Sequence, residues 1–137
     1  MSVTAKIRVK QIDHVTLVSE DLERSAAFYV GVLGMDEVAR PAFAFAGKWF
    51  QAGSTMIHLN IAGEEAGKAG VITNGGTSVS RGIHIAFEVE DFDEALAAIE
   101  AAGIEIVAGP QRRPDGPRQF YVFDPDQHLI EIYSKIG

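Results

Sequence analysis

The sequence predicts an α+β fold made of two tandem modules, each with the element order β-α-β-β-β. Residues 12–22 resemble residues 82–92, and such internal similarity indicates a duplicated unit. In both segments, alternating polar and apolar residues run into an acidic turn and then into apolar residues at helical spacing. We therefore expect a single domain with module 1 at about residues 10–61, a linker at 62–81 and module 2 at about 82–134.

The first module begins with a strand near residues 12–18, because polar and apolar residues alternate there. A helix from Leu22 to Leu33 follows, in which apolar residues recur at i, i+4, i+7 and i+11. Gly34 stands where a C-terminal cap is expected. Three further strands are predicted over residues 35–40, 47–53 and 55–61.

The second module repeats this order. A strand is expected over residues 83–89, and a helix from Phe92 to Ile99 follows with apolar residues at i, i+3, i+4 and i+7. Gly103 stands at the expected C-terminal cap. Residues 62–81, between the modules, are rich in Gly, Ala, Ser and Thr without periodicity, which predicts a linker. The remaining strands are predicted over residues 104–108, 119–123 and 129–133.

The composition limits the possible functions. Apolar residues make up 47% and charged residues 23% of the 137-residue chain, as in an ordinary globular domain. No apolar run approaches the roughly 20 residues of a membrane helix, and no secretory signal is visible, so we expect a cytoplasmic protein without membrane contact. The absence of cysteine excludes disulfides and thiolate metal sites. A net charge of −7 argues against binding nucleic acid through its phosphates.

Three histidines and one glutamate are expected on the sheet face that no helix covers. Each module has one helix, which can cover only one face of a sheet. Residues two apart on a strand share a face, so Val15 and Leu17 are assigned to the helix side of the first strand. The same alternation assigns the following side chains to the opposite, open face: His14, His58, His84 and Glu131.

These four side chains predict a metal site. Imidazole and carboxylate together suit Zn, Fe, Ni, Mn or Co, so we expect one divalent metal per site, held by His14, His58, His84 and Glu131. For each residue alone, the alternative to metal binding is a side chain that is hydrogen-bonded within the protein or exposed to solvent. Their equivalent positions in the repeat favour the metal site. His128 lies in a turn instead and is expected to be structural or exposed.

Five stretches carry a family resemblance: Ile12-Asp13-His14-Val15 and residues 28–35, 56–59, 82–87 and 121–133. They make the chain similar to the vicinal oxygen chelate superfamily, the group of glyoxalase I, extradiol dioxygenases, methylmalonyl-CoA epimerase and the fosfomycin- and bleomycin-resistance proteins. The resemblance covers about residues 10–134 and implies a curved mixed sheet, a half-barrel, around a metal. It also implies a homodimer, since in many members the sheets meet across a two-fold axis. Whether modules pair within one chain or between chains stays open.

The resemblance also implies roles for the four open-face residues. His14, His84 and Glu131 fall on positions that carry ligands in most metal-dependent members. His58 falls on a fourth position, where glyoxalase I typically has a glutamate and the epimerases a glutamine. A histidine there departs from both patterns and puts glyoxalase I activity itself in doubt.

The family therefore implies a metal-dependent lyase or isomerase of the glyoxalase type, acting on a small oxygenated substrate. In this reading the metal chelates two neighbouring oxygens and stabilises an enediolate, and Glu131 is the catalytic base. The second hypothesis is an extradiol-type dioxygenase. Tyr121 precedes Glu131 by ten residues, as in that signature, but Arg112 and Arg113 stand where it needs a histidine, and Gln127 where it needs Gly or Pro. Addition of a thiol or water to an epoxide and non-catalytic drug binding are further alternatives.

Four side chains are candidates for substrate binding. The loop 110–118 carries three arginines in an acidic protein, and Arg113 and Arg118 are expected either to be solvated or to hold an anionic group, which arginine binds in a bidentate way. Tyr121 and Trp49 complete the candidate set, with Trp49 at the mouth of the pocket or in the core.

Overall fold

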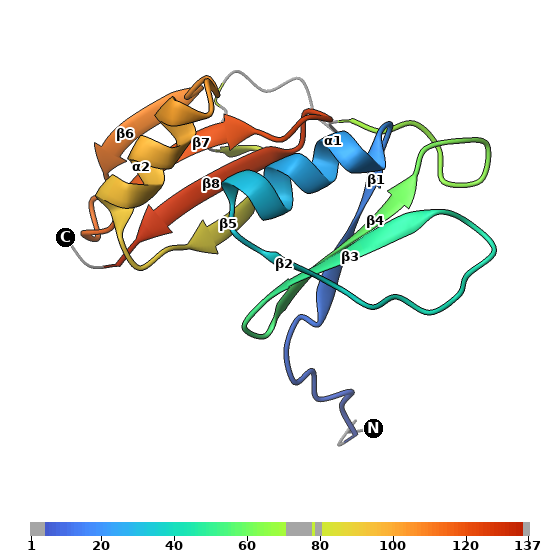
Figure 1. The fold of residues 1–137 in the computed structure, drawn as a ribbon. Helices are drawn as coiled ribbons and strands as arrows, with labels where there is room; N and C mark the ends of the chain where they lie inside the picture. The colour runs from blue at the N-terminus through green and yellow to red at the C-terminus, as the bar shows by residue number, and fades with distance from the viewer. Residues whose placement is uncertain (1–4, 71–77, 79–80, 136–137) are drawn as a thin grey trace.

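In the computed structural model, which describes residues 5–70, 78 and 81–135, the chain forms two four-stranded mixed sheets (Figure 1). The strand order is β1-β4-β3-β2 in the first sheet and β5-β8-β7-β6 in the second. In each sheet the first strand runs parallel to the last, and the other neighbours are antiparallel. The predicted pair of βαβββ modules is confirmed. The elements are β1 (His14–Ser19), α1 (Leu22–Ala26), β2 (Asp36–Val38), β3 (Gly47–Ala52), β4 (Thr55–Ile61), β5 (Ile85–Glu88), α2 (Phe92–Ala101), β6 (Ala108–Arg112), β7 (Arg118–Phe123) and β8 (Leu129–Ser134).

Both helices begin at an aspartate in equivalent positions of the repeat. The Asp21 side chain accepts a hydrogen bond from the backbone N–H of Arg24 at 3.1 Å. The Asp91 side chain does the same for Glu94 at 3.0 Å. An aspartate at this position satisfies a backbone donor that the first helical turn leaves without a partner. Helix α1 then continues into a π-helical segment, Ala27–Val32.

The strand predicted over residues 104–108 is wrong. The observed strand β6 lies later, at Ala108–Arg112. Ile104 and Ile106 pack against the core from a segment outside any strand. Pairing with β7 begins only where the backbone N–H of Val107 donates to the Tyr121 carbonyl at 2.8 Å. The alternation of apolar residues here reflects core packing, and not a sheet ladder.

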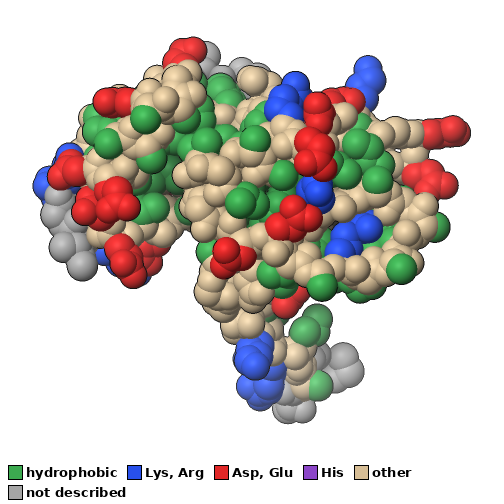
Figure 2. Space-filling view, in the orientation of Figure 1, with side chains coloured by type: hydrophobic (Ala, Val, Ile, Leu, Met, Phe, Trp, Pro, Cys, Tyr) green, Lys and Arg blue, Asp and Glu red, His purple; other side chains and the backbone are tan. Residues whose placement is uncertain are grey.

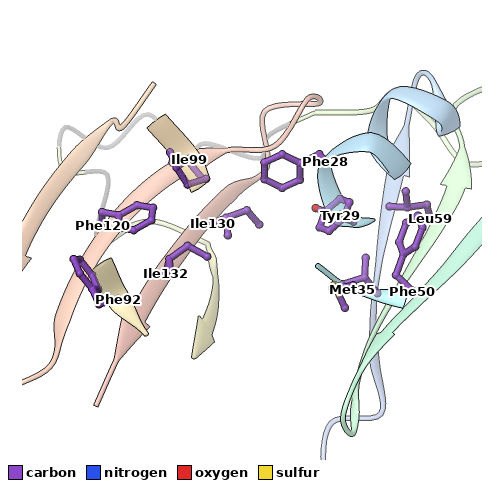
Figure 3. Packing of buried hydrophobic residues seen from close by; sticks show 12 residues of the cluster. Phe28, Tyr29, Met35, Phe50, Leu59, Phe92, Ile99, Phe120, Ile130 and Ile132 are labelled. Carbon is purple, nitrogen blue, oxygen red and sulfur yellow. The ribbon is translucent and has the colours of Figure 1, made fainter. Parts of the chain in front are cut away.

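The apolar core lies between the sheets and the helices. Val15 and Leu17 of β1 pack against it, which confirms their expected orientation toward the helix side. Figure 3 shows Phe28 and Tyr29 between the two sheets, with Leu59 on one side and Ile130 on the other. The helix-facing sides of both modules therefore share one core, and the open faces point away from it. Within the described residues, no helix is long and apolar enough to cross a membrane.

A buried polar network joins the β7–β8 turn of module 2 to the first helix of module 1. The Tyr29 hydroxyl donates to Asp124 Oδ2 at 2.7 Å, and Ser25 Oγ donates to Asp126 Oδ2 at 3.0 Å. Arg24 Nη2 also donates to Asp126, at 3.1 Å. His128 Nδ1 lies 2.8 Å from Asp124 Oδ2, in agreement with its expected structural role. The network fixes one module against the other, while other acidic side chains lie over the surface (Figure 2).

Removing the Tyr29 hydroxyl should weaken this connection. We expect Tyr29→Phe to lower the free energy of unfolding by about 1.5–3 kcal/mol, because a buried hydrogen bond to a charged group is lost. Urea unfolding followed by circular dichroism measures the change. Tyr133→Phe is the matched control, since the described part of the chain offers the Tyr133 hydroxyl no hydrogen bond. Equal stability of the two variants would contradict a role for the network.

Of the predicted linker, residues 62–70, 78 and 81 are described, and the remainder lies outside the described residues. Strands β1 and β5 are edge strands of their respective sheets. They line common cavities: Thr16 and Ile85 border one, and Val15 and Phe87 border another. Each sheet thus keeps one edge strand that forms no ladder with the other sheet.

Candidate metal centre

Two of the predicted ligands lie together on the open face of the first sheet. In the parallel pairing of β1 with β4, Thr16 is opposite His58, so His14 is a diagonal neighbour of His58 on the same face. The two imidazole rings stack with centroids 3.8 Å apart and an angle of 13° between their planes. Trp49, opposite His58 on β3, stacks on its other side at 4.0 Å. The three rings form one row across three strands.

The nitrogens of these two histidines suit metal binding. His14 Nδ1 lies 2.8 Å from Asp13 Oδ2, and a carboxylate at Nδ1 commonly orients a histidine that binds metal through Nε2. His58 Nε2 is buried and has no hydrogen-bond partner among the described residues. Burial, followed by the nearby His14, lowers the pKa of His58. His58 therefore favours the neutral form, which is the form that binds a metal.

The other two predicted ligands lie together on the second sheet. Glu131 of β8 is buried, with 5% of its surface exposed. His84 precedes β5 and places its Nε2 at 3.0 Å from Glu131 Oε1. Its Nδ1 lies 2.8 Å from the Gly82 carbonyl oxygen, which can only accept a hydrogen bond. Nδ1 faces this carbonyl as a donor, and Nε2 faces the Glu131 carboxylate.

Two further groups approach Glu131. The Tyr121 hydroxyl donates to Oε1 at 3.2 Å, and Arg113 Nη1 lies 3.6 Å from Oε2. Burial, followed by the negative charge of Glu131, raises the pKa of Tyr121, so this hydroxyl stays protonated and remains a donor. Glu131 is thus a buried carboxylate held by a hydroxyl on one oxygen and faced by a guanidinium on the other.

The structure brings the predicted residues together as two pairs rather than as one set of four. His14 and His58 belong to the first sheet, and His84 and Glu131 to the second. Among the described residues, no group of three or more His, Asp or Glu side chains is close enough to hold a metal ion. The donor set still fits a divalent metal, because it combines imidazole nitrogens with a carboxylate, and His58 Nε2 has no hydrogen-bond partner among the described residues.

The candidate substrate residues divide between the two faces. Trp49 and Tyr121 lie beside the predicted ligands, and Arg113 approaches Glu131, although it also pairs with Asp115. Arg118 does not join them. It donates to Asp93 of α2 at 3.1 Å, and its guanidinium carbon lies 4.2 Å from the centroid of the Phe92 ring, on the helix side of the sheet. Side chains alternate along β7, so the neighbouring Gln119 lies on the opposite face of the sheet from Arg118. Its Nε2 lies 3.4 Å from the Tyr121 hydroxyl.

No role was predicted from the sequence for two residues near the site, Asp13 and Arg40. Asp13 orients His14, and its place directly before that histidine was the available signal. Arg40 lies in the loop before β3 and is close enough to His58 for its charge to contribute to the lowered pKa of that histidine. Its position depends on how the loop folds, and no local pattern indicates it.

Comparison with known proteins agrees with this architecture. The family model of the Glyoxalase/Bleomycin resistance protein/Dioxygenase superfamily matches residues 11–132. A lactoylglutathione lyase of Schizosaccharomyces pombe is 27% identical over 98% of this chain, which spans only 51% of that relative, about half its length. The fosfomycin resistance protein FosX of Listeria monocytogenes is 25% identical, covering 93% of this chain and 90% of the relative.

A solved structure extends the likeness to the whole fold. The crystal structure of a glyoxalase/dioxygenase from Nostoc punctiforme superposes with a TM-score of 0.79 at 27% identity, covering 100% of this chain and 99% of that one. The duplicated βαβββ topology, the match to the family over both modules and this superposition lead to one conclusion. The chain belongs to the Glyoxalase/Bleomycin resistance protein/Dioxygenase superfamily.

Proposed function

We propose that this chain is a metal-dependent lyase or isomerase that acts on a small oxygenated substrate, with His14, His58, His84 and Glu131 as metal ligands and Glu131 as the base. The observation that carries the proposal is the buried Nε2 of His58, which has no hydrogen-bond partner among the described residues and lies in a ring stack with His14. A buried polar atom without a partner costs free energy, and a metal ion would provide the missing partner. The lack of cysteine suits a reducing compartment, for which we propose the cytoplasm.

We further propose that each site forms between two copies of the chain. The two ligand pairs lie on separate sheets, and both β1 and β5 are sheet edges. Edge strands present backbone groups that a second chain can approach. In a symmetric homodimer, module 1 of one chain would meet module 2 of its partner, and the reverse, so that two equivalent sites arise from one contact. This arrangement supplies both ligand pairs to each site.

The chemistry of such a site follows from its charges. His14, His58, His84 and Glu131 would hold a divalent metal, which would supply Lewis-acid stabilisation of negative charge on substrate oxygens. The Glu131 carboxylate would take the proton from the adjacent carbon. The Tyr121 hydroxyl, which donates to Glu131 Oε1, would hold the carboxylate in position for this transfer. Arg113 would balance negative charge on the other oxygen of Glu131 or on the substrate.

Ring cleavage by a dioxygenase is the second candidate. It is favoured by one contact, the hydrogen bond between Tyr121 and Glu131, which puts a hydroxyl beside the carboxylate of a histidine–histidine–carboxylate ligand set. A screen of metal-loaded protein separates the candidates, using hemithioacetals, catechols under air, and epoxides with thiols or water. Turnover of hemithioacetals is the expected result. Turnover of catechols alone would replace the lyase proposal with the dioxygenase.

Metal titration tests the site without a substrate. We expect chelator-treated protein to bind about one divalent ion per chain when titrated with Ni, Co, Zn, Mn and Fe in turn. His84→Ala should lose most of this binding. His128→Asn removes a histidine outside the site and should retain it, provided that circular dichroism shows the native fold. Absence of a tight site for any of the five metals, or equal binding by the two variants, would contradict the proposal.

A further inference from the structure

The loop between β2 and β3, residues 39–46, carries a cluster of aromatic side chains to the candidate site. It is the long loop drawn in teal beyond β2 in Figure 1. The Phe43 and Phe45 rings stack with centroids 5.3 Å apart, and Phe43 lies 6.3 Å from Trp49. Trp49 in turn stacks on His58. A continuous row of rings therefore connects this loop with the proposed metal ligands.

Arg40 places a positive charge within this cluster. Its guanidinium carbon lies 4.8 Å from the centroid of the Phe43 ring and 5.0 Å from that of Phe45. Its Nη2 donates to the Phe45 carbonyl at 2.9 Å. Its Nε is buried and has no hydrogen-bond partner among the described residues. The two stacked rings therefore lie on the same side of the guanidinium, and part of its donor capacity is unused.

The setting of Arg40 differs from that of several other arginines in this acidic chain. Within residues 5–70, 78 and 81–135, no ion pair of 4.0 Å or less joins Arg40 to a carboxylate. A half-buried cation without a counter-ion is unfavourable, and a bound anion would compensate it. The arginines that do pair with a carboxylate are Arg24 with Asp126, Arg113 with Asp115 and Arg118 with Asp93.

The backbone of β3 leaves room for this arrangement. A Cβ atom on Gly47 would lie 2.9 Å from both Nε and Nη2 of Arg40, and 2.4 Å from the Leu59 carbonyl oxygen. Only a glycine lets the guanidinium pack this closely against the strand. Arg40 is therefore seated at a defined position on the sheet, beside the row of rings, and does not extend freely into solvent.

We propose that Arg40 binds the carboxylate of the substrate and that Phe43, Phe45 and Trp49 hold its flat apolar body, which makes the substrate an aromatic carboxylic acid. The planar guanidinium matches a carboxylate, and aromatic faces bind a flat ring. This inference deepens the proposed function and rests on it, because the reacting end of the substrate would lie at the proposed metal site. The row of rings leads from the loop toward His58 and His14.

Trp49 makes the inference directly measurable, because it is the one tryptophan in the chain. Full-length, chelator-treated protein is titrated with phenylacetate, and the fluorescence of Trp49 is followed. Phenylacetamide, which keeps the ring but loses the charge, and acetate, which keeps the charge but loses the ring, serve as comparison probes. We expect saturable quenching by phenylacetate and binding weaker by about tenfold or more for both comparison probes.

Substitutions assign the effect to Arg40. Arg40→Gln should weaken phenylacetate binding by roughly 10- to 100-fold and leave phenylacetamide binding unchanged. Arg40→Lys keeps the charge without the planar fork and should fall between Arg40→Gln and the wild type. Arg8→Gln removes an exposed arginine from the N-terminal segment and should change nothing.

The outcomes separate this inference from the proposed function. Absence of quenching by phenylacetate, equal affinity for phenylacetate and phenylacetamide, or unchanged phenylacetate affinity in Arg40→Gln and Arg40→Lys would overturn it. Because the titration uses metal-free protein, failure here with intact metal binding rejects only the aromatic carboxylate. Failure of metal binding with normal phenylacetate binding instead rejects the proposed enzyme and keeps the binding site.

Discussion

Replacing Glu131 with glutamine should lower turnover by about 10²–10⁴-fold, which is the usual cost of removing a general base. The amide cannot accept the substrate proton, although its oxygen can still bind a metal. Three histidines would remain as ligands, so we expect the metal content to fall much less than the activity. The measurement is kcat on the substrate that the activity screen identifies, together with metal analysis of the same samples.

Glu88→Gln is the matched control for this prediction. Glu88 is also a strand glutamate of module 2, but it is exposed and pairs with Lys135 at 3.7 Å. Its substitution should leave both turnover and metal content near those of the wild type. If Glu131→Gln instead kept full activity, Glu131 would not be the base, and oxygen chemistry at the same ligand set would become the better explanation.

Much of the fold could be predicted because the signals are local and repeated. Asp21 and Asp91 mark equivalent helix starts, and alternation along β1 assigned Val15 and Leu17 to the core. The π-helical continuation of α1 was not predicted, because apolar spacing does not distinguish it from an α-helix. The strand predicted at residues 104–108 failed because Ile104 and Ile106 meet the core without pairing. The spacing of apolar residues predicts burial more reliably than it predicts backbone hydrogen bonding between strands.

The candidate site was predictable only in part. Alternation placed His14, His58, His84 and Glu131 on the sheet face that no helix covers, because a strand fixes the face of each side chain. It could not show that the pairs lie on separate sheets. That separation depends on contacts between distant segments, such as the hydrogen bond from Tyr29 to Asp124, which are 95 residues apart in the chain. The position of Arg40 likewise depends on loop folding around Phe43 and Phe45.

A site shared between two chains predicts complementation between two inactive variants. His14→Ala damages the module 1 ligands, and His84→Ala damages the module 2 ligands, so each homodimer should lose its metal. In a dimer that contains one chain of each variant, one site receives both substitutions. The other site receives module 1 from the His84→Ala chain and module 2 from the His14→Ala chain, and all its ligands are intact. The mixed dimer should therefore recover a function that neither parent has.

The direct test is the metal content of this mixed dimer. The two variants are co-expressed with different affinity tags, and dimers that carry both tags are isolated by two successive purifications. The mixed dimer should have about half the metal content and activity of the wild-type dimer, since one of two symmetric sites is restored. Both parent homodimers, purified in the same way, should contain almost none. A mixed dimer as empty as its parents, or a wild-type protein that is monomeric and still binds metal, would contradict a site shared between chains.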